Sequence, residues 1–463
     1  MLTYDFEKVD GPIYEYLYNC IKKDIFSGIL KPGEKLPSKR TFAKNNGIST
    51  ITIQNAYDQL ISEGYVYTLP KKGYYVAKIE GIAKSLPKNK VKYNINIPQS
   101  EAYEYDLSGN GINADNFPFS IWNRISREVM SNYQKELMTI SPASGVKELR
   151  KAISEHLKSF RGMLIDPDQI VIGAGTEFLY GQIVQLLGND RSYGIENPGY
   201  KKLETVYKQL HARCSFLSMD NEGVTLESLK SSRTEVAHIC PNHHFPTGIT
   251  MPASRRYEIL GWANSSEGRY IIEDDYDSEF RLSGKPIPTL FSIDANEKVI
   301  YMNTFSKSLS PTIRISSMVL PVHLANLFYQ KMGQNSCTVS NFEQYTLAEF
   351  ISKGYFEKHI NRMRLYYIRQ RKKIIETINE SAAGKHCEIL ESDSGLHFLI
   401  KIDTKLTDKE MLTKLKRKGI KIKALSDYFF DESHEKQHLF IINYSNLDEN
   451  AAQKALEIIG ELL

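Results

Sequence analysis

The chain has 463 residues, 41% of them hydrophobic, and a formal net charge of +4 at pH 7. This length accommodates two or three domains with cores of their own. The sequence has no run of about 18 apolar residues and no charged leader followed by an apolar stretch, which argues against membrane insertion and secretion. Its five cysteines lack metal-ligand spacing and suit a reducing cytoplasm.

Residues 12–78, near the start of the chain, have a composition and an apolar spacing of their own. Apolar residues recur on one helical face and predict a first helix that ends near Gly28: Ile13, Leu17, Ile21 and Ile25. The pattern indicates a small, separately folded domain at 1–78.

Two further helices are predicted on either side of Gly47. Ser38 can cap the first, which runs to Lys44, and Ser49 can cap the second, at residues 50–63. Two helices joined at a glycine turn are typical of a helix-turn-helix, whose second helix enters the major groove of DNA.

A β-hairpin is predicted after Gly64, with strands at 65–67 and 74–76 and with Lys71 and Lys72 at its tip. The first hundred residues carry 15 Lys and Arg against 9 Asp and Glu, a net +6, whereas the remainder carries −2. This excess has the sign that phosphate contacts require, although a solvated basic face is the plainer alternative. Residues 79–104 show no sustained apolar period and are interpreted as a linker.

A strand, a glycine turn and a helix start follow one another at residues 170–178. Backbone amides of Gly175 and Thr176 at such a helix N-terminus can bind phosphate, although a tight connection without a ligand has the same pattern. Further on, Tyr200 follows the turn at 196–199 and can either stack on a planar ring or pack in a core.

A short apolar strand at residues 269–272 leads into a cluster of carboxylates and Tyr276. A carboxylate at a strand end can keep the nitrogen of a pyridine ring protonated, and Asp274 is our candidate for that role. Tyr276 could donate a hydrogen bond to an oxygen on the same ring. A divalent cation is the alternative, but nothing nearby completes a ligand set, and we expect no metal.

Residues 303–314 place one lysine among small hydroxyl residues, with an arginine seven positions later. The Lys307 amine can form a Schiff base with pyridoxal 5′-phosphate, a cofactor with the ring just described. Thr304, Ser306 and Arg314 can supply hydrogen bonds and positive charge to its phosphate. An isolated Ser-Lys pair would rather indicate a solvated loop.

The N-terminal segment resembles the winged helix-turn-helix of the GntR family of bacterial transcription factors, on the stretches 31–38, 56–57 and 63–65. The resemblance implies that one set of residues touches phosphates or base edges and that two wing lysines reach the DNA backbone: Ser38, Arg40, Ser49, Thr50, Thr52 and Gln54, with Lys71 and Lys72.

Residues 105–463 resemble the fold-type I aminotransferases, on the segments around Asp274 and Lys307. The resemblance implies an α/β fold with a mainly parallel sheet between helices at 105–345, and an inter-domain helix with a smaller α+β domain at 346–463. It also implies a role for each candidate: Lys307 as the Schiff-base lysine, Asp274 beside the pyridine nitrogen, Tyr276 beside the ring oxygen, Tyr200 against the ring, and Gly175, Thr176, Thr304, Ser306 and Arg314 around the phosphate. Phe245 stands where aminotransferases usually have an asparagine.

Together the two parts resemble the MocR family, also called GabR-type regulators. This implies a cytoplasmic, domain-swapped homodimer that binds double-stranded operator DNA and senses pyridoxal phosphate or an amino compound through aldimine exchange at Lys307. Lys202 stands where GABA-sensing members have an arginine and is our candidate effector contact. The strand expected at 438–444 lacks the arginine that usually holds a substrate carboxylate, so we expect a ligand other than a dicarboxylate or a GABA-like amino acid.

Two other functions stay open from the sequence. The chain could be an aminotransferase with an accessory DNA-binding module, because Lys307, Asp274 and Tyr276 are all present. It could also be a regulator that has lost cofactor chemistry. We favour a regulator over an enzyme, with residual transamination left open.

Overall fold

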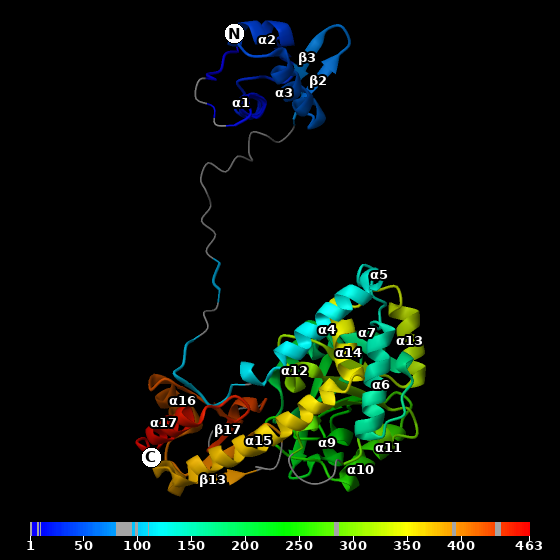
Figure 1. Cartoon of the computed structure of the whole chain (residues 1–463), viewed down its shortest axis with the longest axis vertical. Helices are drawn as coiled ribbons and strands as arrows, with labels where there is room; N and C mark the ends of the chain where they lie inside the picture. Colours follow the sequence, from blue (N-terminus) through cyan, green and yellow to red (C-terminus); the bar gives the residue numbers. More distant parts are fainter. Residues whose placement is uncertain are drawn as a thin grey trace. The chain divides into compact units, whose positions relative to one another are not determined.

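The structure is a computed structural model of the whole chain (Figure 1). It describes residues 2–6, 9, 11–79, 95–97, 101–109, 111–281, 287–390, 395–430 and 437–463. The chain divides into two compact units, Met1–Ser100 and Glu101–Leu463, which are described separately. Most of the linker expected at 79–104 lies outside the described residues.

The first unit contains three helices, α1 (Ile13–Phe26), α2 (Lys39–Asn46) and α3 (Thr50–Ser62). They lie where the apolar spacing and the two serine caps place them. Their buried faces share one core: Leu17, Ile21, Phe42, Ile53, Tyr57 and Leu60. Because the core takes one face of α3, its opposite face stays exposed.

A small antiparallel sheet completes this unit. The expected hairpin is formed by β2 (Val66–Leu69) and β3 (Gly73–Val76), and Tyr67 stacks on Tyr75 across it. A third strand, β1 (Lys35–Leu36), pairs with β3. Two residues are too short to show a period, and for this reason the sequence pattern does not predict β1.

The second unit is built on an eight-stranded sheet. Its strands, in spatial order, are β5 (Ile170–Gly173), β12 (Ser316–Val319), β11 (Val299–Thr304), β10 (Tyr270–Asp274), β9 (Val236–Ile239), β6 (Ser192–Asn197), β7 (Arg213–Asp220) and β8 (Gly223–Val224). The central strands from β11 to β7 are parallel, and β5, β12 and β8 are antiparallel to their neighbours. Buried residues on both faces explain the near-continuous apolar runs of these strands.

Helices pack on the sheet and on one another. They are α4 (Phe119–Asn132), α5 (Gln134–Leu137), α6 (Lys147–Arg161), α7 (Thr176–Leu187), α8 (Lys201–Gln209), α9 (Leu226–Ser231), α10 (Ala253–Asn264), α11 (Leu290–Ile293), α12 (Phe305–Ser308), α13 (Val322–Met332) and α14 (Asn341–Ser352). Helix α14 packs against α4 and α6 and spans the boundary expected between residues 345 and 346.

The long helix α15 (Tyr355–Glu380) runs from beside α14 to the C-terminal elements (Figure 1). These form an antiparallel sheet of β13 (Cys387–Leu390), β14 (His397–Ile402), β17 (Leu439–Asn443) and β16 (Lys423–Ala424), with α16 (Asp408–Arg417) and α17 (Glu449–Gly460). A parallel pair, β4 (Tyr105–Asp106) with β15 (Ile420–Lys421), brings the start of this unit to its C-terminal part. Within the described parts of the chain, no helix combines the length and apolar character that crossing a bilayer requires.

Candidate functional site

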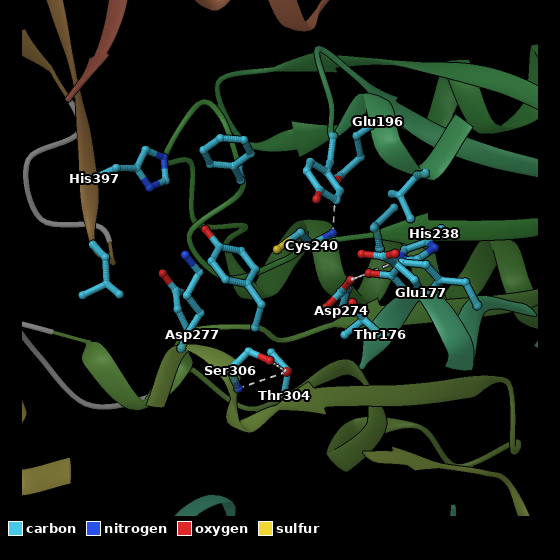
Figure 2. A pocket seen from close by; sticks show the side chains of 18 of the residues that line it. Thr176, Glu177, Glu196, His238, Cys240, Asp274, Asp277, Thr304, Ser306 and His397 are labelled. Atoms are coloured by element: carbon cyan, nitrogen blue, oxygen red, sulfur yellow. Dashed lines mark hydrogen bonds and ion pairs between the residues drawn. The ribbon is translucent and has the colours of Figure 1, made fainter. Parts of the chain in front are cut away.

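Four parallel strands of the large sheet end at one cavity of about 250 Å³. Glu196 at the end of β6, Cys240 after β9, Asp274 at the end of β10 and Thr304 at the end of β11 all line it (Figure 2). In open α/β sheets, ligands bind beyond the carboxyl ends of parallel strands. The sheet topology therefore gathers polar groups at the place where such a fold holds a ligand.

Lys307 lines this cavity from the short helix α12. Burial lowers the pKa of its amine to about 8, and the nearby Asp277 carboxylate opposes that decrease. A lysine with a pKa near 8 has about a tenth of its amine unprotonated at pH 7 and about half at pH 8, far more than an ordinary lysine. The amine can therefore act as a nucleophile toward a carbonyl group.

Asp274 faces the same cavity and is held by two neighbours. The Tyr180 hydroxyl donates a hydrogen bond of 2.6 Å to Asp274 Oδ2, and His238 Nε2 lies 3.4 Å from the same oxygen. The second oxygen, Oδ1, is buried without a hydrogen-bond partner among the described residues. A buried acceptor left open in this way fits a ligand that brings its own N–H, such as a protonated ring nitrogen.

A site suited to an anion lies where strand β5 leads into helix α7. Gly175 has φ 93°, which favours glycine, and a Cβ at this position would overlap the guanidinium of Arg314. The N-terminus of α7 at Thr176 faces the cavity together with Arg314. A helix N-terminus beside an arginine fits a phosphate group.

The hydroxyl residues before Lys307 form a hydrogen-bonded chain at the edge of this anion site. The Thr304 hydroxyl donates to Ser306 Oγ at 3.0 Å and accepts from the Ser306 backbone N–H at 3.2 Å (Figure 2). Ser316 donates to Thr304 Oγ1 at 2.8 Å. Thr304 and Ser306 both line the cavity, so these hydrogen bonds fix the orientation of their hydroxyl oxygens there.

Two tyrosines line the same cavity as Asp274 and Lys307. The Tyr276 hydroxyl donates to the backbone oxygen of His243 at 2.7 Å, and burial raises the pKa of the Tyr276 hydroxyl. Tyr200 is 43% exposed and meets Phe245 edge to face, with 6.3 Å between ring centroids. Both tyrosines line the cavity, as does Phe245.

The candidate effector contact Lys202 lies outside the cavity lining. Its amine forms an ion pair with Glu177, which does line the cavity and lies 4.0 Å from Arg314. Lys202 is thus linked to the anion site through Glu177, and its charge is already paired.

Several cavity residues were not among those singled out from the sequence: Tyr180, Glu196, His238, Cys240, Asp277, Leu396, His397 and Asn443. Asp277 directly follows Tyr276, so its place in the acidic cluster was a usable signal. His397 begins β14, about 90 residues after Lys307, and no local pattern marks it.

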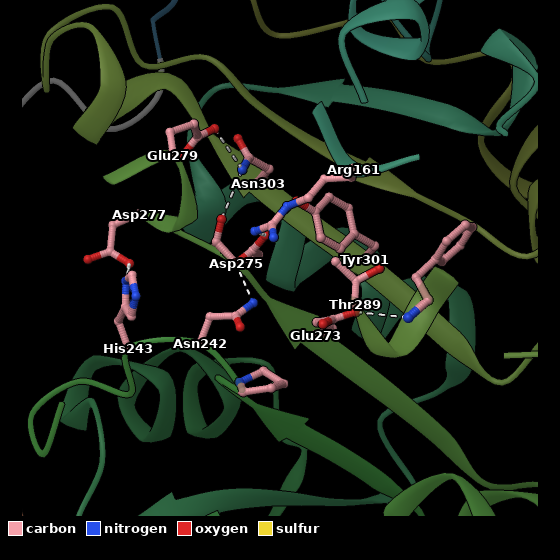
Figure 3. A network of polar contacts seen from close by, with 12 residues as sticks. Arg161, Asn242, His243, Glu273, Asp275, Asp277, Glu279, Thr289, Tyr301 and Asn303 are labelled. Atoms are coloured by element: carbon pink, nitrogen blue, oxygen red, sulfur yellow. Dashed lines mark hydrogen bonds and ion pairs between the residues drawn. The ribbon is translucent and has the colours of Figure 1, made fainter. Parts of the chain in front are cut away.

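A buried polar network supports the strand that carries Asp274 (Figure 3). Asp275 accepts hydrogen bonds from Arg161 at 2.7 Å, Tyr301 at 2.7 Å and Asn242 at 3.0 Å. Successive residues of an extended chain point to opposite sides, so this anchor turns Asp274 toward the cavity.

Two further buried carboxylates flank Asp275. Burial raises the pKa of Glu273 to about 7 and that of Glu279 to about 7, and in both cases the Asp275 charge adds to the increase. Glu279 Oε1 accepts from the Asn303 side chain at 3.3 Å. Two buried arginines balance these carboxylates: Arg161 pairs with Asp275 at 2.7 Å, and Arg256 lies 3.9 Å from Glu273.

In the first unit, the residues expected to contact DNA are grouped at the starts of α2 and α3 and at the wing tip. The Ser38 and Ser49 hydroxyls accept hydrogen bonds from the N–H groups of Thr41 and Thr52 and so cap the two helices. Arg40 and Thr50 are exposed, as are the two wing lysines.

Gln54 is the expected DNA contact with the most internal partners. Its Nε2 donates to both carboxylate oxygens of Asp58, at 2.7 and 2.6 Å, and its Oε1 accepts from the Lys39 amine. Gln54 would have to exchange one of these bonds to reach a base edge.

Comparisons with known proteins match both parts of the chain. The family model for bacterial regulatory proteins of the gntR family matches residues 13–76, and that for aminotransferase class I and II matches residues 112–459. The HTH-type transcriptional regulator YdeL of Bacillus subtilis is 35% identical over 90% of this chain and 90% of its own length. The probable rhizopine catabolism regulatory protein MocR of Rhizobium meliloti is 27% identical over 98% of this chain and 94% of its own.

Among solved structures, kynurenine aminotransferase of Pyrococcus horikoshii matches with a TM-score of 0.69 and 24% identity, over 78% of this chain and 91% of its own. At this identity the likeness shows the fold alone. The expected fold class is confirmed: a winged helix-turn-helix followed by a fold-type I aminotransferase fold.

Proposed function

Because the chain belongs to the MocR-type transcription regulators, in which a GntR domain is joined to an aminotransferase-like domain, we propose that it binds pyridoxal 5′-phosphate at Lys307. We further propose that it senses the cofactor itself or an amino compound that reacts with it. The observation that carries this proposal is one cavity that holds both a partly buried lysine with a lowered pKa and a buried carboxylate oxygen without a hydrogen-bond partner among the described residues.

Different cavity residues would hold different parts of such a cofactor. When bound, the cofactor supplies an aldehyde carbon that bonds to an amine and a ring that withdraws electrons. Asp274 would accept a hydrogen bond from the protonated ring nitrogen, and Tyr276 would lie beside the ring oxygen. Tyr200 would cover one ring face.

The phosphate would be held by the group at the turn before α7 and at the lysine segment: Gly175, Thr176, Thr304, Ser306 and Arg314. Lys202, through its pair with Glu177, would adjust this end of the cavity rather than contact the effector directly. The effector contact expected at Lys202 would then be an indirect one, because Lys202 is paired with Glu177 and is not among the described lining residues.

The switch we propose is the exchange of the Lys307 nitrogen for the nitrogen of an incoming amine. The carbon–nitrogen bond to Lys307 would be replaced by one to the incoming amine, and Lys307 would be released as a free amine. A protein that interacts differently with the two states shifts its conformational equilibrium, and this shift would alter DNA binding.

DNA binding is proposed for the exposed face of the first unit. The starts of α2 and α3 offer Arg40, Thr50 and Thr52 to the major groove, and the wing offers Lys71 and Lys72 to the phosphate backbone. The partner is double-stranded operator DNA, which places the proposed activity in the cytoplasm.

We infer a homodimer, domain-swapped as the family resemblance implies. Exposed apolar side chains on neighbouring elements of the second unit support a partner face: Met130, Met138, Ile140 and Phe342. Asn341 binds two backbone oxygens of the segment that carries Met138 and Ile140, at 2.9 and 2.7 Å, and so joins these elements. Exposed apolar residues that cluster in this way are typical of interaction surfaces.

The cofactor part is tested by the absorbance of the purified full chain after incubation with pyridoxal phosphate. A visible band that is absent from Lys307→Ala is expected. Unchanged absorbance of the wild type, or the same band in the variant, would overturn the proposal.

The DNA part is tested separately with an operator fragment selected from random sequences. Arg40→Ala combined with Thr52→Ala should weaken operator binding at least about fivefold, because a lost charged contact and a lost polar contact cost about 1–3 kcal/mol together. Cofactor absorbance should stay unchanged, and Lys31→Ala in the same unit is the matched control. Equal affinity of wild type and double variant would contradict the assignment.

Transamination is the second candidate, favoured by the presence of Lys307, Asp274 and Tyr276 in one cavity. Repeated turnover of an amine donor to its carbonyl product, lost in Lys307→Ala, would support it. A single turnover at most is what our proposal expects.

A further inference from the structure

The part of the cavity around Lys307 contains no second cation among the described residues. Lys307 and Arg314 are the lysine and arginine of the described lining, and Arg314 lies at the other end, against Gly175. The neighbouring His397 is neutral, because burial lowers its pKa to about 3, and its Nε2–H donates to the Pro246 oxygen at 3.2 Å. Within the described lining, a ligand carboxylate at this end would find no cation other than Lys307 itself.

Asp277 instead presents a carboxylate to this space. Its side chain is 1% exposed and lines the cavity, close enough to Lys307 to raise the pKa of that amine (Figure 2). Oδ1 accepts from His243 Nδ1 at 3.0 Å, whereas Oδ2 is buried and lacks a hydrogen-bond partner within the described chain. The adjacent Tyr276 hydroxyl donates to the His243 backbone oxygen.

The position of Asp277 is fixed from two sides. His243 holds one oxygen, and Gly395 lies so close to the other that a Cβ at Gly395 would overlap it. The buried oxygen therefore cannot turn away to solvent, and it needs a donor from a ligand or from Lys307. A buried acceptor of this kind attracts an ammonium group and repels an anion.

An apolar wall completes this end of the cavity. Phe245 and Leu396 line it, and Phe245 meets His397 and Tyr428 edge to face, with 5.2 and 5.1 Å between ring centroids. Tyr428 belongs to a small buried cluster with Leu399, Leu425 and Ile441. These walls suit the methylene groups of an alkyl chain.

We propose that the Lys307 end of the cavity selects a primary alkylamine without an acidic group, and that Asp277 determines this selectivity. This inference rests on the proposed function, since it names the class of amine that the same cavity takes. A second ammonium group on the ligand would be accepted at Asp277 Oδ2, whereas a carboxylate would be buried beside a like charge. Specificity of this kind comes from repulsion of the wrong ligand as much as from attraction of the right one.

The test uses the full chain loaded with pyridoxal phosphate and three ligands of equal chain length: pentylamine, 1,5-diaminopentane and 5-aminopentanoate. Dissociation constants are measured by absorbance titration and by calorimetry. We expect both amines to bind at least about tenfold more tightly than 5-aminopentanoate, a factor that one unfavourable charge contact readily supplies. Equal or tighter binding of 5-aminopentanoate would overturn the proposal.

The variant Asp277→Asn keeps the shape of the side chain and removes its charge. It should reduce the preference for 1,5-diaminopentane over 5-aminopentanoate to within about threefold. Glu449→Gln, which removes an exposed charge on α17, is the matched control and should keep the wild-type preference. An unchanged preference in Asp277→Asn would refute the role of Asp277.

The wild-type comparison decides the ligand class even where the variant fails to fold. Failure of the proposed function has a different signature, namely no visible band on addition of pyridoxal phosphate. A protein that takes up the cofactor but prefers 5-aminopentanoate refutes the selectivity alone.

Discussion

The Tyr180 hydroxyl donates a hydrogen bond of 2.6 Å to Oδ2 of Asp274, while Oδ1 of the same carboxylate is buried and has no hydrogen-bond partner among the described residues. The tyrosine thus fixes the orientation of the carboxylate and leaves one oxygen for a ligand. Tyr180 comes from α7 and Asp274 from β10, so this arrangement also links the proposed phosphate end of the cavity to the ring end.

The first prediction concerns the charge of Asp274. Asp274→Asn should weaken pyridoxal phosphate binding by roughly ten- to a hundredfold, because a hydrogen bond to a charged group contributes about 1.5–3 kcal/mol. Equilibrium dialysis with the cofactor measures the change. Tyr180→Phe should reduce the affinity for pyridoxal phosphate less, because the carboxylate keeps its charge. A larger loss of affinity in Tyr180→Phe than in Asp274→Asn would contradict the assignment.

The second prediction concerns the close approach of Gly175 and Arg314. In Gly175→Ala, the added Cβ would overlap the arginine, and the backbone would be strained at φ 93°. The variant should lose affinity for pyridoxal phosphate at least about tenfold, while its affinity for pyridoxal, which has no phosphate, changes little. Calorimetry with both compounds separates the two effects. Gly181→Ala, at a site with room for a Cβ, is the control.

The third prediction is a pH dependence. The pKa of Lys307 is lowered to about 8, and the unprotonated amine is the form that attacks an aldehyde. The rate of cofactor uptake by the cofactor-free protein should therefore rise with pH through a midpoint of about 8 and level off above it. In Asp277→Asn the midpoint should move to lower pH, because the Asp277 carboxylate raises the pKa of this amine. Rapid-mixing absorbance at a series of pH values measures both midpoints, and a shift to higher pH would be the contrary result.

The fourth prediction concerns stability. Arg161 is 4% exposed, and Arg161→Ala removes the guanidinium that pairs with the buried Asp275 carboxylate at 2.7 Å. We expect the free energy of unfolding to fall by about 3–5 kcal/mol, the cost of breaking a buried ion pair. Urea denaturation followed by circular dichroism measures it. Lys373→Ala, which removes an exposed partner of Glu449, should cost only about 0–1 kcal/mol.

Local signals account for much of what was expected from the sequence. The serine caps and the apolar spacing predicted α2 and α3, and the turn at Gly175 predicted the start of α7. Small deviations occur at element ends, where hydrogen bonding rather than residue type decides the boundary. The strand β1 was missed because pairing with β3, and no pattern of its own, makes it a strand.

By itself, the sequence determined the family, the two-part organisation and the segments that carry Asp274, Tyr276 and Lys307. Each of these features depends on short motifs whose residues are neighbours along the chain. Only the tertiary structure decided which side chains share the cavity. Parallel strands that are far apart in sequence bring their ends together, and β14 adds His397 from a different sheet. Asp277 shows both sides of this division: its place beside Tyr276 is evident from the sequence, but its unpaired oxygen near Lys307 arises only from packing against His243 and Gly395.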